Sequence, residues 1–235
     1  MFLYLYRFQL SNMKQISPKI DNSPPEANPV KVQLIEIASQ AFSSYGIKNV
    51  TMDEIASQAG ISKRTLYQLF ADKEALLYEC VLSQQERLHR FIQEVLKQTS
   101  NVLEIILHSY KYTIRQYHNT DKRFFEDIQK YPKVYKVFLR GQERDSNETL
   151  HFFQKGVNQG LFRNDVNFEI VNILVREQFN YLLHSDINLK YPFVEVFESI
   201  MFTYLRGIST SKGLEKLEQF IRDYREEELT LNSKQ

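Results

Sequence analysis

The chain has no tryptophan and little cysteine, glycine or proline: its 235 residues include one cysteine, 7 glycines and 6 prolines. A single cysteine, Cys80, excludes an intrachain disulfide framework and is typical of a reducing compartment, which predicts a cytoplasmic protein. Its thiol is either a redox sensor or, more commonly for a lone cysteine on a helix, a small packed group. Few turn residues interrupt long stretches rich in Leu, Ile, Glu, Lys, Gln and Phe, so we predict an all-α fold.

The chain also lacks an excess of charge and a long apolar run. Its formal net charge is +1, so any nucleic-acid surface must come from the arrangement of charges. No uncharged apolar run approaches the ~20 residues that span a bilayer, and no membrane partner is expected. Residues 1–10 are apolar but contain Arg7, without the order of a signal peptide. The sequence favours Met13 as the translation start, with residues 1–12 as an upstream extension.

Composition divides the chain into three parts. Residues 14–29 are polar and hold four of the six prolines, which predicts that residues 1–29 form a flexible arm. Helical periodicity begins at Val30. We expect a first domain over residues 30–78 and a second helical domain over residues 79–235.

The first domain shows clear helix boundaries. A helix is predicted over residues 30–45, with Gly46 as a left-handed C-terminal cap. The next begins after Thr51, which forms a capping box with Glu54, and Gly60 ends it.

A third, short helix is predicted from a Ser62 cap to about Phe70. A fourth runs from an Asp72 cap to about Gln98. Helical segments then follow at roughly 101–118, 121–143, 145–160, 167–185, 191–208 and 211–229.

Two of these later segments are apolar on more than one face, which is typical of helices buried both in their own core and against a partner. The segments are 167–185, with Ile170, Ile173, Leu174, Phe179 and Leu182, and 191–208, with Phe193, Val196, Phe197, Ile200, Met201 and Tyr204. We predict that they form a homodimer interface.

The third helix has two distinct faces. Its inward side is formed by Ile61, Leu66, Leu69 and Phe70, and its outward side by Lys63, Arg64, Tyr67 and Gln68. Lys and Arg suit guanine edges, Gln suits adenine, and Tyr reaches a phosphate or a thymine methyl, so the outward side suits major-groove reading. An ordinary solvated face would look similar, and acidic residues outnumber basic ones locally, which predicts modest non-specific DNA affinity.

A resemblance separates these alternatives. It rests on Ala41-Phe42, Tyr45-Gly46, Thr51-Met52, Ile55-Ala56, Ala59-Gly60-Ile61-Ser62-Lys63, Thr65-Leu66-Tyr67, Phe70 and Asp72-Lys73-Glu74-Ala75-Leu76-Leu77. Over about 45 residues this stretch resembles the DNA-binding domain of the TetR family. The turn at residues 160–166 is similar to one that recurs in the family's second domain.

The resemblance implies an N-terminal three-helix helix-turn-helix domain, joined through a fourth helix to a helical effector-binding and dimerisation domain. Phosphate contacts are implied for Thr51, Thr65, Tyr67 and Lys73, and base reading for Lys63, Arg64 and Gln68 with Tyr67. Thr51 and Ser62 begin helices, whose N-termini attract phosphate. The resemblance further implies a repressor that binds a palindromic operator as a homodimer and is released when an effector shifts the fourth helix.

The sequence does not identify the effector. Aromatic residues in the second domain favour an apolar or aromatic molecule, although helical cores contain such residues anyway. No cofactor is expected.

Two other classes remain open from the residues alone. A di-metal carboxylate enzyme would use Glu86 with His89 and Glu148 with His151, but each glutamate lies about 200° around its helix from the apolar stripe. A protein-interaction module would leave the cationic face of the third helix without a role.

Overall fold

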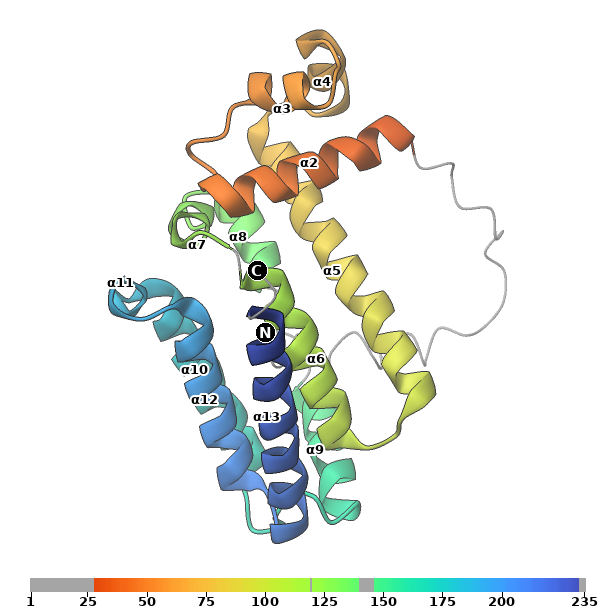
Figure 1. Ribbon diagram of the computed structural model, residues 1–235, viewed down its shortest axis with the longest axis vertical. Coiled ribbons are helices and arrows are strands. Elements are labelled where there is room, and N and C mark those ends of the chain that lie inside the picture. The colour runs from red at the N-terminus through yellow and green to blue at the C-terminus, as the bar shows by residue number, and fades with distance from the viewer. Residues whose placement is uncertain (1–27, 119, 140–145, 233–235) are drawn as a thin grey trace. The chain divides into compact units, whose positions relative to one another are not determined.

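The computed structural model describes residues 28–118, 120–139 and 146–232, and every regular element within them is a helix (Figure 1). The predicted all-α class is confirmed. Of the predicted arm, residues 1–27 lie outside the described residues, as does Met13.

The described residues form two compact units, one of residues 28–91, 112–118 and 120–139 and one of residues 92–111 and 146–232. The helices of the first unit are α2 (Pro29–Tyr45), α3 (Met52–Gln58), α4 (Lys63–Leu69), most of α5 (Lys73–Gln98), the end of α6 (Val102–Tyr117), α7 (Lys122–Ile128) and α8 (Pro132–Leu139). The second unit contains the end of α5, the start of α6, α9 (Ser146–Asn158), α10 (Phe168–His184), α11 (Ile187–Lys190), α12 (Phe193–Ile208) and α13 (Ser211–Asn232).

Local hydrogen bonds set the limits of the short helices α3 and α4. The Thr51 hydroxyl accepts the Glu54 N–H at 3.2 Å, and the Glu54 carboxylate accepts the Thr51 N–H at 2.7 Å, which confirms the predicted capping box. Gly60, at φ +67°, takes the chain into the turn between the helices. The Ser62 hydroxyl then accepts the Thr65 N–H at 3.1 Å and caps α4.

The core of the first unit forms where α2 packs against α3 and α7, and α3 packs against α4. Its fully buried side chains include Leu34, Ala38, Phe42, Ile47, Ile55, Leu66 and Leu76. Cys80 is also buried, and its thiol donates to the Ile35 carbonyl at 3.5 Å. Because burial raises the pKa of the Cys80 thiol to about 12, this residue is a packed group rather than a reactive thiolate.

Two predicted segments differ in the structure. The single helix predicted over residues 121–143 is wrong, because the described part is divided into α7 and α8. Pro132 begins α8, and a proline lacks the N–H that a continuous helix would need there. The break predicted at residues 185–192 contains the short helix α11.

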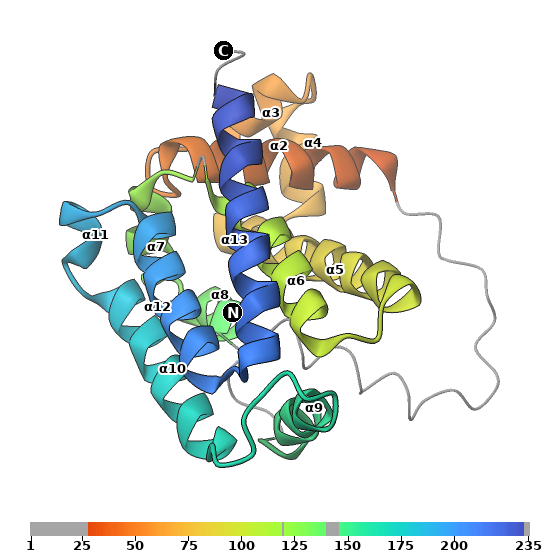
Figure 2. The same cartoon turned by 60° about the horizontal axis from the view of Figure 1, so that its bottom comes forward.

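In the second unit, α10 and α12 lie side by side in both views, and α12 also packs against α13 (Figures 1 and 2). The fully buried ring of Tyr110 lies among the rings of Phe197, Phe202, Phe220 and Tyr224. This aromatic cluster brings α6, α12 and α13 together.

The turn at residues 160–166 is joined to the connection between α12 and α13. Gly160 has φ +70°, and the Arg163 N–H donates to the Ile208 carbonyl at 2.8 Å. A Cβ atom on Gly213 would lie 2.1 Å from the Leu161 carbonyl oxygen, so this close approach needs glycine.

Candidate nucleic-acid interface

α4 presents the two faces that the sequence predicts. Leu66 is fully buried and Phe70 is 2% exposed, while Ile61 and Leu69 are half-buried. The exposed side chains are the predicted base-reading residues Lys63, Arg64, Tyr67 and Gln68. The inward face therefore fixes α4 on the core and leaves the polar face open to solvent.

The cations of this face differ in their surroundings. Lys63 forms an ion pair with Asp53 of α3. The sequence did not predict this interaction, because the two residues lie ten positions apart on different helices. Arg64 has no ion-pair partner among the described residues. The guanidinium is thus free to meet a base or a phosphate, whereas the Lys63 ammonium must first leave Asp53.

Thr51 begins α3 but already faces an anion. Its hydroxyl donates to the Glu54 carboxylate at 2.9 Å. Hydrogen bonds from the Thr51 backbone and hydroxyl lower the pKa of Glu54, so this carboxylate stays charged. A DNA phosphate at Thr51 would have to displace the carboxylate or bind beside it.

The hydroxyl groups of Ser62 and Thr65 lie 2.8 Å apart at the start of α4. Ser62 is exposed and Thr65 is half-buried, so both hydroxyls lie at the edge of the exposed polar face of α4. The geometry gives one hydrogen-bonding pair of hydroxyls beside Arg64.

Lys73, the fifth predicted phosphate contact, is half-buried at the start of α5. Its ammonium donates to the Lys48 carbonyl at 3.4 Å, and burial lowers its pKa. Lys31 is also engaged, because its ammonium lies 3.1 Å from Glu79 and 5.7 Å from the centre of the Phe70 ring. Several cations of the first unit therefore hold the unit together and are less available to DNA.

Comparison with known proteins identifies the arrangement. Residues 34–80, which include α3 and α4 entire, match the family model described as bacterial regulatory proteins, tetR family. The transcriptional repressor KstR2 of Mycobacterium tuberculosis H37Rv is 23% identical over 163 residues, covering 67% of this chain and 82% of KstR2. The transcriptional regulator UidR of Escherichia coli K12 is 36% identical over 77 residues, covering 32% of this chain and 39% of UidR. A solved transcriptional regulator from Cytophaga hutchinsonii has a TM-score of 0.60 at 20% identity, covering 78% of this chain and all of that one.

Residues 34–80 thus form a DNA-binding domain of the tetR family type. The chain is a DNA-binding transcriptional regulator. Regulators of this family bind operator DNA and are typically dimers that respond to small molecules.

The di-metal alternative has no support. The Glu86 side chain is 55% exposed and lies 3.9 Å from Arg90. The Glu148 side chain lies outside the described residues. Among the residues that were placed, no group of three or more His, Cys, Asp or Glu side chains is arranged to bind a metal, and none of the helices is long and apolar enough to cross a membrane.

The second unit of this regulator has an exposed apolar surface on α10, beside α12. The large apolar side chains that α10 leaves exposed are Ile170 (54%), Ile173 (44%), Leu174 (49%) and Tyr181 (62%). An open groove of about 1030 Å³ runs along α10 and α12 beside them, with Leu174, Tyr181, Ile200 and Thr203 in its lining.

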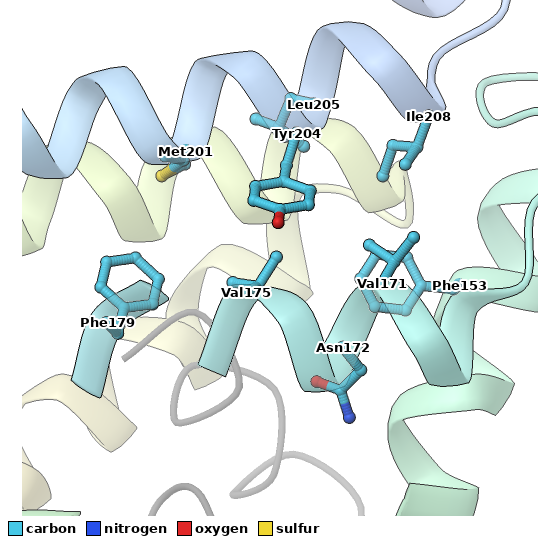
Figure 3. Close-up of a pocket in the computed structure, with 9 residues that line it drawn as sticks. All are labelled: Phe153, Val171, Asn172, Val175, Phe179, Met201, Tyr204, Leu205 and Ile208. Carbon is cyan, nitrogen blue, oxygen red and sulfur yellow. The ribbon is translucent and has the colours of Figure 1, made fainter. Parts of the chain in front are cut away.

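A small cavity lies between α9, α10 and α12 (Figure 3). Its lining is apolar apart from Asn172 and the Tyr204 hydroxyl, and Figure 3 shows the Tyr204 ring pointing from α12 toward Val175 on α10. The cavity volume is about 20 Å³, enough for a single water. A small-molecule site needs several hundred Å³, so this space would have to expand before it could hold an effector.

Proposed function

We propose that this regulator is a repressor that binds a palindromic operator as a homodimer and is released by a small molecule. The exposed polar face of α4, opposite the buried Leu66, is the observation that carries the proposal. We assign base reading to Lys63, Arg64, Tyr67 and Gln68, and phosphate contacts to Thr51, Ser62, Thr65, Tyr67 and Lys73.

We further propose a division of labour along the chain. Residues 30–78 bind DNA, residues 79–235 bind the effector and form the dimer, and the proposed arm ends before α2, which begins at Pro29. The helix α5 begins in the first of these regions and continues into the second. Such a helix can carry a displacement from one to the other.

The dimer is proposed to form through α10 and α12. Ile170, Leu174 and Tyr181 recur at spacings of four and seven residues, which places them along one side of α10. Exposed apolar side chains in a row are typical of a protein–protein contact. A second copy of the same surface would cover them across a two-fold axis, which suits a palindromic site.

Release of the operator requires the effector to prefer the state that cannot bind DNA. A preference of about 1–3 kcal/mol changes operator affinity by roughly fivefold to a hundredfold, and operator DNA then weakens effector binding by the same factor. We propose an apolar or aromatic effector, because the small cavity between α9, α10 and α12 is lined mainly by apolar side chains.

The DNA-binding proposal is tested by mixing the protein with sheared genomic DNA at about 150 mM salt, where non-specific contacts are weakened. Bound fragments are then sequenced. We expect enrichment of a short palindrome, and loss of that enrichment in Tyr67→Ala and Lys63→Ala. Gln40→Ala, an exposed change on α2, is the matched control.

An effector that co-purifies could mask binding, so the selection is repeated with protein that has been unfolded, stripped of ligand and refolded. No enrichment in either preparation contradicts the proposal. Enrichment that survives both α4 substitutions would instead assign DNA binding to another surface.

A further inference from the structure

The helix α7 holds the turn between α2 and α3 at three points. The Asp121 N–H, just before α7, donates to the Ser43 carbonyl of α2 at 2.7 Å. Gly46 packs so closely that a Cβ atom there would lie 2.7 Å from the Arg123 Cβ, and its φ of +80° also favours glycine. The third contact is made by Asp127.

Asp127 is a buried carboxylate, 5% exposed, near the end of α7. One oxygen accepts the Lys48 backbone N–H at 2.7 Å, and the other accepts the Lys130 ammonium at 2.7 Å. Lys130 is largely exposed, so only the first bond reaches another element. A buried carboxylate is costly unless donors satisfy it, and an apolar side chain would pack at this position without that cost. A charged residue at this position therefore has a specific partner, which is the backbone N–H of Lys48.

The backbone of Lys48 is held from two helices at once. Its N–H is bound by Asp127 of α7, and its carbonyl accepts the Lys73 ammonium of α5. Three residues later Thr51 caps α3, which packs against α4. The position of the exposed polar face of α4 therefore depends on the backbone of one residue, Lys48, which both α5 and α7 contact.

We propose that Asp127 is a positioning residue for operator binding: by holding the Lys48 N–H it sets the place of α3 and α4 relative to α7. This inference rests on the proposed operator binding. It adds a second connection to the one through α5, because α7 follows α6, and α6 begins in the second unit.

The test combines Asp127→Ala, which removes the acceptor, with Asp127→Asn, which keeps one oxygen for the Lys48 N–H. Lys130→Ala is the matched control, since it removes the other partner of the same carboxylate. Three quantities are measured: helix content, affinity for the enriched palindrome and for unrelated DNA, and hydrogen exchange of the Lys48 amide by NMR.

We expect Asp127→Ala to weaken palindrome binding by at least about fivefold and to speed exchange at Lys48, with unrelated DNA bound as before. Asp127→Asn should fall between Asp127→Ala and wild type, and Lys130→Ala should stay within about twofold of wild type on both readouts. A merely structural role would lower stability without changing the ratio of palindrome to unrelated DNA affinity.

Wild-type palindrome affinity in Asp127→Ala, or unchanged exchange at Lys48, overturns the inference. If Asp127→Ala does not fold, Asp127→Asn decides, and behaviour equal to Lys130→Ala overturns it. Failure of the wild-type protein to enrich any DNA would count against the proposed function, whereas the exchange measurement reports on the Lys48 contact without DNA.

Discussion

The outward faces of α4 and α10 both expose large side chains, but their chemistry is opposite. On α4, Tyr67 is 49% exposed beside Arg64 and Gln68. On α10, Tyr181 is 62% exposed on the same helix as Ile170 and Leu174, which are also open. Water solvates the first face well, whereas leaving apolar area in water costs roughly 25 cal/mol per Å². The chemistry of an exposed face thus indicates its partner: a polar nucleic acid for α4 and a second apolar surface for α10.

The two helices are also held in different ways. α4 has only seven residues and depends on the Ser62 cap and one buried leucine. α10 has 17 residues and packs along the length of α12. Substitutions on α4 should therefore change recognition, while substitutions on the open side of α10 should change assembly.

Leu174→Lys places a charge in the middle of the α10 face and should have the largest effect. Leu174 is half exposed in the single chain, so the folded protomer accommodates the lysine, but a dimer would bury it. We expect a monomer by analytical ultracentrifugation. Operator affinity should fall by about 100-fold or more, because two linked half-site contacts become one.

Glu215→Lys is the matched control, since it adds a lysine to an exposed position on α13. It should remain a dimer and bind the operator normally. A dimeric Leu174→Lys protein would show that α10 is not the interface and would remove the comparison between the two faces.

Arg64→Ala tests the other face and should cost about fivefold to a hundredfold in operator affinity, because a good arginine–guanine contact is worth about 1–3 kcal/mol. The protein should stay dimeric and fold normally, since Arg64 is exposed. Titration of selected DNA with single base changes measures the effect and locates the base concerned. Equal losses for every sequence would indicate a phosphate contact instead.

Local chemistry explains what the sequence could predict. The Thr51–Glu54 capping box, the Ser62 cap and the Gly46 cap each depend on residues within a few positions, so their helices were predicted nearly to the residue. The two faces of α4 follow from helical spacing alone, and the structure places the polar side chains outward.

Long-range contacts explain which features the sequence could not predict. The Lys63–Asp53, Lys73–Lys48 and Asp127–Lys48 interactions join residues 10, 25 and 79 positions apart. No spacing rule connects such pairs, because the packing of helices brings them together. The one available signal was Asp127 itself, an acidic residue that helical spacing places on the same side as Phe124, three positions before it.

Acid should weaken the attachment of α7 before it affects the apolar face of α10. Burial alone would raise the pKa of Asp127, but hydrogen bonds from Lys130 and the Lys48 N–H outweigh it and lower the pKa, and the Arg123 side chain lowers that of Asp121 to about 2. An unfolded aspartate titrates near about 3.9. The unfolded chain therefore binds more protons below that pH, so this stabilisation is present above about pH 4 and is lost as the pH falls toward 2. Urea unfolding between pH 7 and 3 should show the loss, and Asp127→Asn should flatten it. Identical pH slopes would remove Asp127 as a cause.

Asp53→Asn should give the smallest effect and the opposite sign. The substitution removes the ion-pair partner of Lys63 and one negative charge beside the exposed polar face of α4. Both residues are more than half exposed, so the lost pair costs little stability, at most about 1 kcal/mol. The freed ammonium can then meet a phosphate or a base edge, and we expect operator affinity to rise by about twofold to fivefold with a steeper salt dependence. The double variant Asp53→Asn/Lys63→Ala supplies the control, since without the lysine the gain should shrink to the effect of one removed charge. A loss of affinity in Asp53→Asn would mean that Asp53 orients Lys63 for DNA rather than competing with it.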